Sequence, residues 1–140
     1  MRGLATLLTI AAASLPLTSI RAHEGEDHGP GGAHFTAPAE AWKAAQGSVK
    51  SIESLVAAKN LKPIHDEQEK LDAALNYLQA NTKDVADKAR FDGAIKNATA
   101  ASGRLHEAAD AGDQAKVESG LKTLQGTIAM VEKQLPASAK

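Results

Sequence analysis

The chain has 140 residues, no cysteine, 16 basic and 17 acidic side chains, and a formal net charge of −1 at pH 7. The lack of cysteine excludes disulfides, thiolate metal sites and covalent attachment of a c-type haem. The nearly balanced charge argues against a nucleic-acid partner. A chain of this length makes one domain with a modest core that packing alone must hold.

The first 22 residues have the pattern of a secretory signal peptide. Arg2 gives a basic start, an apolar stretch runs from Leu4 to Leu15, and Ala22 supplies the small residue that a signal peptidase requires at its cut. The stretch is shorter than the roughly 20 apolar residues of a membrane-spanning helix. We therefore expect export to the periplasm, cleavage near Ala22 and no membrane span in the mature chain. Cleavage a residue or two away and a retained N-terminal anchor are the alternatives.

Residues 23–35 are Gly, His and acid with almost nothing apolar, and this composition predicts a disordered tail. Cleavage after Ala22 would leave 118 residues that begin with His23. Because Arg2 and Arg21 leave with the leader, the mature chain would carry 14 basic and 17 acidic side chains, a net charge of −3.

Beyond the tail, residues 36–140 are rich in Ala, Leu, Lys and Glu with helical periodicity, which predicts four helices. The first spans about 37–59, with Thr36 as its N-cap and Pro38 in its first turn. Apolar residues recur along it at spacings close to three, four and seven. They are Trp42, Val49, Ile52 and Val56.

The other three helices show steps that alternate between four and three residues, as left-handed packing in a bundle requires. The second spans about 63–80, with a stripe of Ile64, Gln68, Leu71, Leu75 and Leu78. The third spans about 83–111 after a cap at Asn81 or Thr82 and ends at Gly112, with a stripe of Phe91, Ile95, Ala98, Ser102, Leu105 and Ala109. The fourth spans about 114–135 between Asp113 and Pro136, with a stripe of Val117, Leu121, Leu124, Ile128, Val131 and Leu135.

Short connections force consecutive helices to run antiparallel, so the sequence predicts an all-α, up-down-up-down four-helix bundle. Its core looks thin, because Ala is abundant on the stripes and several glycines fall inside the helices, where each costs up to about 1 kcal/mol relative to Ala. We expect marginal stability. Either small residues let the helices approach closely, or a ligand or partner adds stability by binding the folded form.

A resemblance to periplasmic four-helix-bundle cytochromes, of the soluble b-type and the c-prime kind, is carried by FDGAI at 91–95 and AADAGDQAKV at 108–117. It implies the fold. It does not imply haem, since the first helix has no Met and the last no His where the b-type family has its axial ligands, and the Cys-x-x-Cys-His motif of the c-prime family is absent. Met130 lies about 140° from the fourth stripe and is expected to face water.

The tail sequence HEGEDHG at 23–29 is similar to the His-acid N-termini of periplasmic components of heavy-metal efflux and copper handling. Imidazole suits Cu(II), Ni(II) and Zn(II), and an N-terminal His can chelate through its amine and ring. We expect weak or moderate, exchangeable metal binding by the tail, although a solvated spacer is the alternative. The candidate ligands are His23, His28, His34, Glu24, Glu26 and Asp27.

A second candidate site lies in the bundle. His65 is in the first turn of the second helix and His106 in the penultimate turn of the third, so antiparallel packing brings both to one end of the bundle, opposite the tail. Each lies at the edge of its stripe and has an acid four residues on, Glu69 and Asp110 respectively. The pattern permits a site of two His and a carboxylate for Zn, Cu or Ni, or a pair of ordinary surface contacts.

The sequence holds no recognisable catalytic constellation or phosphate loop, so we expect a protein without enzymatic activity. The favoured function is binding of a divalent transition metal in metal tolerance or delivery in the periplasm, with an efflux component as the candidate partner. The alternative is a structural or interaction module whose helices pack against a partner protein.

Overall fold

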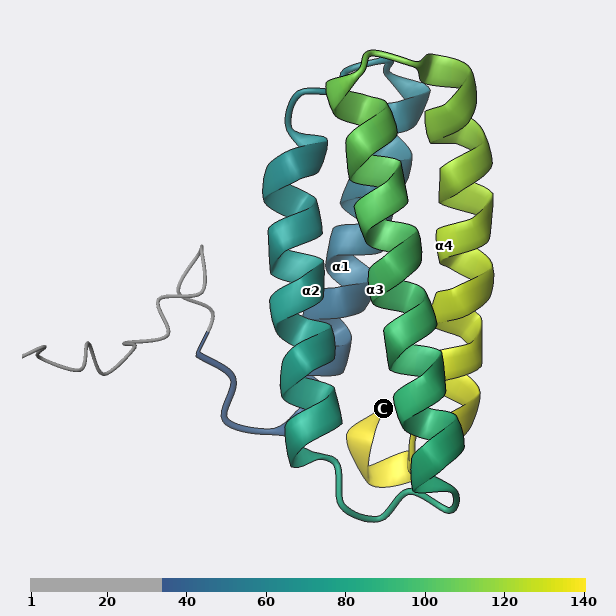
Figure 1. Cartoon of the computed structure of the whole chain (residues 1–140). Coiled ribbons are helices and arrows are strands. Elements are labelled where there is room, and N and C mark those ends of the chain that lie inside the picture. Colours follow the sequence, from purple (N-terminus) through teal and green to yellow (C-terminus); the bar gives the residue numbers. More distant parts are fainter. Residues whose placement is uncertain (1–33) are drawn as a thin grey trace, which may run out of the picture.

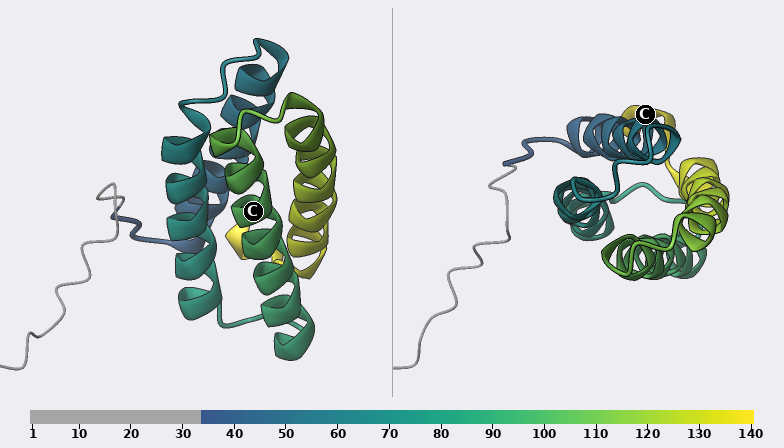
Figure 2. Two further views of the ribbon diagram at one scale, coloured as in Figure 1. Left: turned by 45° about the horizontal axis from the view of Figure 1, so that its top comes forward. Right: turned by 90° about the horizontal axis from the view of Figure 1, so that it is seen from above.

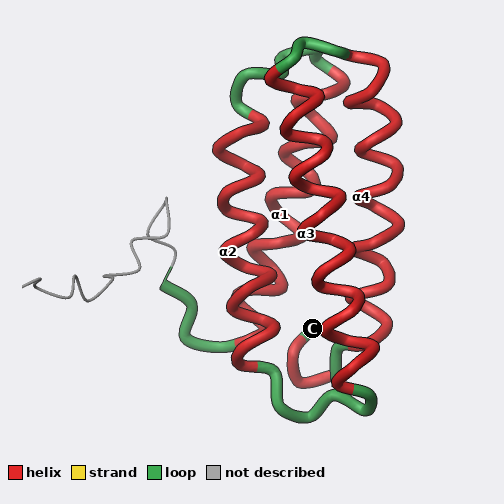
Figure 3. Tube along the Cα trace, in the orientation of Figure 1, coloured by secondary structure: helices red, strands yellow, loops and turns green. Residues whose placement is uncertain are grey.

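The computed structural model describes residues 34–140, which form an all-α bundle without strands in this part of the chain (Figures 1 and 3). The predicted fold class is confirmed. The predicted leader and residues 23–33 of the predicted tail lie outside the described residues. The elements are α1 (Pro38–Ala57), α2 (Ile64–Asn81), α3 (Lys88–Asp110), α4 (Gln114–Gln134) and a 3-10 helix, η1 (Ala137–Ala139).

Consecutive helices run antiparallel, and the view along the bundle axis shows α1, α2, α3 and α4 in that order around it (Figure 2). The α1–α2 and α3–α4 connections lie at one end, at the top in Figure 1, and the α2–α3 connection lies at the other. The start of α2 and the end of α3 therefore share the upper end. The chain enters α1 at the lower end.

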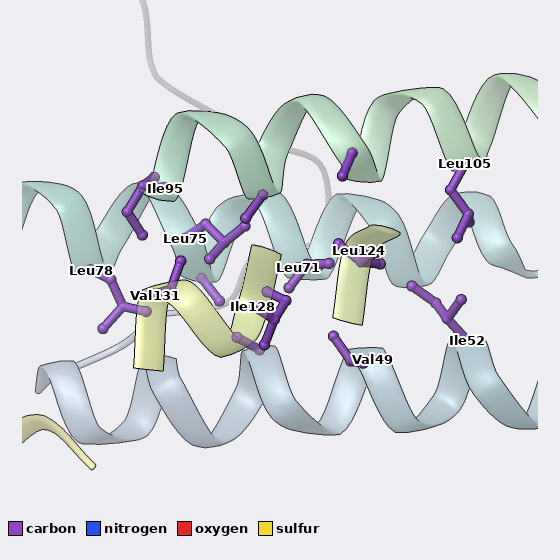
Figure 4. Close-up of a cluster of buried hydrophobic side chains, with 14 of the residues drawn as sticks. Val49, Ile52, Leu71, Leu75, Leu78, Ile95, Leu105, Leu124, Ile128 and Val131 are labelled. Atoms are coloured by element: carbon purple, nitrogen blue, oxygen red, sulfur yellow. The ribbon is translucent and has the colours of Figure 1, made fainter. Parts of the chain in front are cut away.

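The core fills the space between the helices with the apolar stripes that the sequence predicts (Figure 4). Every residue of the first and third stripes is buried, including Ser102 on α3. Gln68 on α2 and Leu121 on α4 are half-buried. Met130 is 55% exposed, as expected from its position on the outer face of α4.

The helices do not pack equally. The α1–α2 and α3–α4 pairs pack most extensively, the α2–α3 pair less so, and the α1–α4 pair least. The short helix η1, which the sequence pattern did not predict, packs against α1 and buries Ala139. The C-terminal residues thereby cover part of the weakest seam.

The predicted start of the third helix is wrong by five residues. The helix begins at Lys88, not near residue 83, and its N-cap is Asp87, whose carboxylate accepts a hydrogen bond from the backbone N–H of Arg90 at 3.0 Å. Thr82 is extended and buried, and Val85 packs against the core from the loop. Apolar burial holds residues 82–87 outside the helix.

The ends of the first helix also differ from the prediction. Ala37, not Thr36, is the N-cap of α1, and Thr36 instead donates from its backbone N–H and its hydroxyl to the carboxylate of Glu40, each at 2.8 Å. These bonds lower the pKa of Glu40. At the other end Lys59 takes a left-handed conformation with φ of 55°, so α1 stops at Ala57.

The connection between α3 and α4 has the helix end and the helix cap that the sequence predicts. Gly112 has φ of 68°, a conformation that favours glycine, and ends α3 as predicted. Asp113 is the N-cap of α4 and accepts from the backbone N–H of Lys116 at 3.1 Å. The side chain of Lys116 also pairs with this carboxylate and lowers the pKa of Asp113.

Candidate metal centre

Two histidines meet at the upper end of the seam between α2 and α3. His65 projects from the first turn of α2 and His106 from near the end of α3, which antiparallel packing places at the same level. Their ring centroids lie 4.6 Å apart, and Nδ1 of His65 is 2.7 Å from Nε2 of His106. The two histidines that the sequence placed at one end of the bundle are therefore in direct contact.

Each histidine also contacts the acid four residues further along its own helix. Nε2 of His65 lies 3.1 Å from Oε1 of Glu69, and Nε2 of His106 lies 3.1 Å from Oδ2 of Asp110. Both predicted pairs are present. The two carboxylates differ in place, because Asp110 approaches the nitrogen that faces the other histidine, whereas Glu69 approaches the nitrogen on the far side of the His65 ring.

The contact between the two rings is a hydrogen bond whose donor and acceptor depend on the tautomer of each histidine. A neutral pair needs a hydrogen on one of the two facing nitrogens and a lone pair on the other. Glu69 and Asp110 lie within ion-pair distance of the Nε2 atoms and would stabilise a positive charge on either ring.

The four side chains of the site are exposed to different degrees. Those of His65 and Asp110 are 49% and 66% exposed, whereas those of His106 and Glu69 are 22% and 28% exposed. His65 and Asp110 are therefore the more accessible members and His106 and Glu69 the more enclosed ones.

The nitrogen separation is slightly too short for one ion to bridge the pair. Two imidazoles bound at 2.0–2.1 Å with an angle between 90° and the tetrahedral value place their nitrogens about 2.8 to 3.4 Å apart. The observed 2.7 Å is a hydrogen-bonding distance. Accordingly, in the described part of the chain no three or more His, Asp or Glu side chains are already grouped as a metal-ion cage.

A group of polar side chains that the sequence reasoning missed continues down the same seam. Gln68 donates a hydrogen bond to Oδ2 of Asp72 within α2, and Ser102 of α3 lies one turn below His106 and is 1% exposed. Within residues 34–140, Oδ1 of Asp72 and the Ser102 hydroxyl oxygen are both buried, and neither has a hydrogen-bond partner besides the contact between Ser102 and Asp72 that lowers the pKa of this carboxyl group. Gln68, Asp72 and Ser102 are called the seam cluster below.

The electrostatics of the seam cluster centre on Asp72. Burial raises the pKa of its carboxyl group, and the nearby Ser102 hydroxyl, the Gln68 amide and the charge of a protonated His106 act in the opposite direction. The signal in the sequence was available, since Gln68 and Ser102 interrupt otherwise apolar stripes. Two polar residues at core positions on facing helices indicate a polar patch between those helices.

The tail candidates lie elsewhere. His34 is exposed and precedes α1, which begins at the end of the bundle opposite the histidine pair. Next to it, Phe35 packs edge-on against Tyr77 of α2, with ring centroids 5.4 Å apart. The remaining candidates, His23, Glu24, Glu26, Asp27 and His28, lie outside the described residues. The structure thus brings together the four bundle residues and keeps His34 apart from them.

No family model, curated protein or solved structure matches this chain. None of the helices described in residues 34–140 is long and apolar enough to cross a membrane. The case for function therefore depends on the chemistry of the chain itself.

Proposed function

We propose that this protein binds a divalent transition metal ion, of the Cu, Ni or Zn class, between α2 and α3. The ligands are Nδ1 of His65, Nε2 of His106 and the carboxylate of Asp110. The observation that carries the proposal is the direct contact of two imidazole nitrogens at 2.7 Å, with a carboxylate oxygen 3.1 Å from one of them.

The donor set suits these metals. Imidazole nitrogen is a preferred ligand of Zn(II), Cu(II) and Ni(II), and two His with one carboxylate leave at least one position open for water or a donor from another molecule. Oε1 of Glu69 lies 3.1 Å from the far nitrogen of His65, and a hydrogen held there would leave the other nitrogen free for the metal, as carboxylates beside metal-bound histidines commonly arrange.

The physiological role that we propose is capture and hand-over of metal outside the cytoplasm, in metal tolerance or delivery. The leader pattern of residues 1–22 supports export, and the His-acid segment 23–35 supplies further exchangeable ligands. Two half-exposed ligands and an open coordination position favour an ion that can leave again. An efflux component that receives the ion is the partner that this role requires.

The test is a calorimetric titration of Zn(II) and Cu(II) into the protein with its whole tail. We expect a binding event in the wild type that His65→Ala and His106→Ala each abolish. His34→Ala is the matched control, since it removes an exposed imidazole at the opposite end of the bundle and leaves that event intact.

The other outcomes are equally informative. Binding that survives both bundle variants but disappears when His23, His28 and His34 are replaced together would overturn the bundle site and assign the metal to the tail. A wild type that binds neither ion would remove the metal function and leave the alternative, an interaction module that packs against a partner protein.

A further inference from the structure

We infer that residues 136–140, called the latch below, hold the seam between α1 and α4 closed, and that this seam opens on its own while the other helix pairs stay packed. The latch contains η1, which packs against α1 and leaves Ala139 only 2% exposed. The view along the bundle axis shows the C-terminus beside α1 (Figure 2). The inference does not depend on the proposed metal site.

The seam between α1 and α4 has less packing than the seam between any other two neighbouring helices of α1 to α4. The contact of α1 with η1, a helix of three residues, is almost as extensive as the contact of α1 with α4, a helix of 21 residues. A large part of what holds α1 to the second half of the chain therefore belongs to the latch. Without the latch, the seam would depend on a sparse contact between two helices.

The side-chain hydrogen bonds that cross this seam are polar contacts that water can replace. The amide of Gln125 donates to Oε1 of Glu53 at 2.6 Å in an exposed position, and the amide of Gln114 donates to the backbone C=O of Val56 at 3.1 Å. Such bonds contribute little net stability where water offers the same partners. Gln114 begins α4 and lies at the upper end of the seam, whereas the latch lies at the lower end (Figure 1).

The latch lies beside the part of α1 that carries Trp42. Trp42 is 2% exposed and lines a shallow hollow together with Lys140 of the latch. Pro136 is extended and ends α4, and both Leu135 before it and Ala139 after it are buried. Trp42 is the only tryptophan of the chain. Its exposure to solvent therefore reports whether the latch is closed.

The latch is weak enough to open before the helices unfold. It holds a single 3-10 turn without a side-chain cap, and Ala139 adds only one methyl group to the buried surface. Segments with few buried apolar contacts open locally at a lower free energy than global unfolding requires. The pairs α1–α2, α2–α3 and α3–α4 keep more extensive contacts, so release of the latch would open the bundle along one seam.

The first experiment measures the emission of Trp42 and its quenching by acrylamide in the full-length wild type, Ala139→Asp and Ser138→Asp. Ala139→Asp places a charge at the buried contact, whereas Ser138→Asp adds the same charge at an exposed position of the same turn. We expect emission at longer wavelength and faster quenching in Ala139→Asp, and no change in Ser138→Asp. Ala139→Gly removes only the methyl group and should give a smaller shift in the same direction, which keeps the test decisive if Ala139→Asp does not fold.

The second experiment identifies which seam opens, from the distance between two spin labels. The chain has no native cysteine, so introduced cysteines are labelled specifically. One pair of exposed positions, Lys50→Cys with Lys122→Cys, spans α1 and α4, and the other, Asn76→Cys with Lys96→Cys, spans α2 and α3. We expect Ala139→Asp to move the first pair to longer distances, to leave the second pair unchanged and to keep the helix content by circular dichroism.

A change confined to the label pair across α1 and α4 supports the latch. If neither Ala139 variant alters the emission of Trp42 or the distance across α1 and α4, residues 136–140 are not a latch. If Ala139→Asp lengthens both label distances or lowers the helix content, the C-terminal residues stabilise the bundle as a whole and the seam does not open separately, which overturns the inference.

Discussion

At the residue scale, two acids with the same spacing do different chemistry. Glu69 and Asp110 each lie four residues after a histidine, yet one contacts the far nitrogen of its ring and the other contacts the nitrogen that faces the partner ring. The difference arises because His65 meets its neighbour through Nδ1 and His106 through Nε2. In the proposed site this asymmetry makes Asp110 a ligand and Glu69 an orienting group.

Asp72 gives a prediction about the metal-free protein and pH. Because burial raises the pKa of this carboxyl group in the folded state, the folded protein holds the proton more tightly than the unfolded chain. Its contribution to stability is therefore full below the unfolded pKa and falls as pH rises through the folded pKa. Since Asp72 is only half-buried and solvent screens its charge, we expect Asp72→Asn to raise the free energy of unfolding by less than about 1 kcal/mol at pH 7 and by less still near pH 4.

Urea denaturation of both proteins at the two pH values measures this difference. Asp84→Asn, an exposed acid in the connection between α2 and α3, is the control and should change stability little at either pH. A variant Asp72→Asn that is less stable than the wild type at pH 7 would mean that the carboxylate makes a favourable structural contact.

Part of the candidate site could be predicted from these residues alone. The positions of His65 and His106 on their helices fix their angle to the core and the end of the bundle that they share, so their proximity followed from the helical period and antiparallel packing. Which ring nitrogens meet depends on rotamers and helix rotation, which no spacing encodes. Asp72 was missed because its neighbour Leu71 carries the apolar stripe and Asp72 lies just beside it.

At the scale of the helix, the internal glycines are not explained by close packing. A Cβ added at Gly47, Gly93, Gly103 or Gly126 would meet nothing within 4 Å, whereas one added at Gly120 would lie 3.4 Å from Cβ of Leu105. Only at Gly120 do α3 and α4 approach each other closely at a glycine. The other four weaken their helices without a packing gain.

This difference distinguishes two substitutions in α4. Gly126→Ala should raise the free energy of unfolding by up to about 1 kcal/mol, because alanine has the higher helix propensity and the site is open. Gly120→Ala should gain at least as much, since its methyl group would in addition make an ordinary van der Waals contact with Leu105. Chemical denaturation monitored by circular dichroism measures both, and a loss of stability in Gly120→Ala would show that α3 and α4 leave no room for a methyl group.

The existence of the helices was predictable, and some of their boundaries were not. The alternation of four and three residues identifies α2, α3 and α4, and spacings close to three, four and seven identify α1, because both patterns reflect burial in the bundle. The start of α3 was misplaced because Thr82 is a good cap by residue type, yet its burial and the packing of Val85 keep the chain extended until Asp87. Thr82 and Asp87 are both favourable N-cap residues by type, and tertiary packing determines that the helix begins after Asp87.

At the scale of the whole molecule, the proposed ion bridges two helices whose contact is of intermediate extent. A ligand that binds only the folded state adds about 2.7 kcal/mol when its free concentration is 100 times its Kd. For a domain of this size we expect Zn(II) at that ratio to raise the Tm by on the order of 10 °C.

Differential scanning calorimetry of the wild type and His106→Ala, each with and without Zn(II), measures the shift. The variant should melt at the same temperature in both conditions. If Zn(II) raises the Tm of His106→Ala as much as that of the wild type, the stabilising ion binds outside the histidine pair.

The unequal packing of the helices has a consequence for how the molecule opens. Since α1 packs best on α2 and α3 packs best on α4, the bundle consists of two helical hairpins joined along weaker seams. Hairpins of this kind are natural units of local unfolding, which can separate before either one melts. His65 belongs to the α1–α2 hairpin and His106 to the α3–α4 hairpin. An ion bound to both histidines would therefore link the two hairpins and make them unfold together.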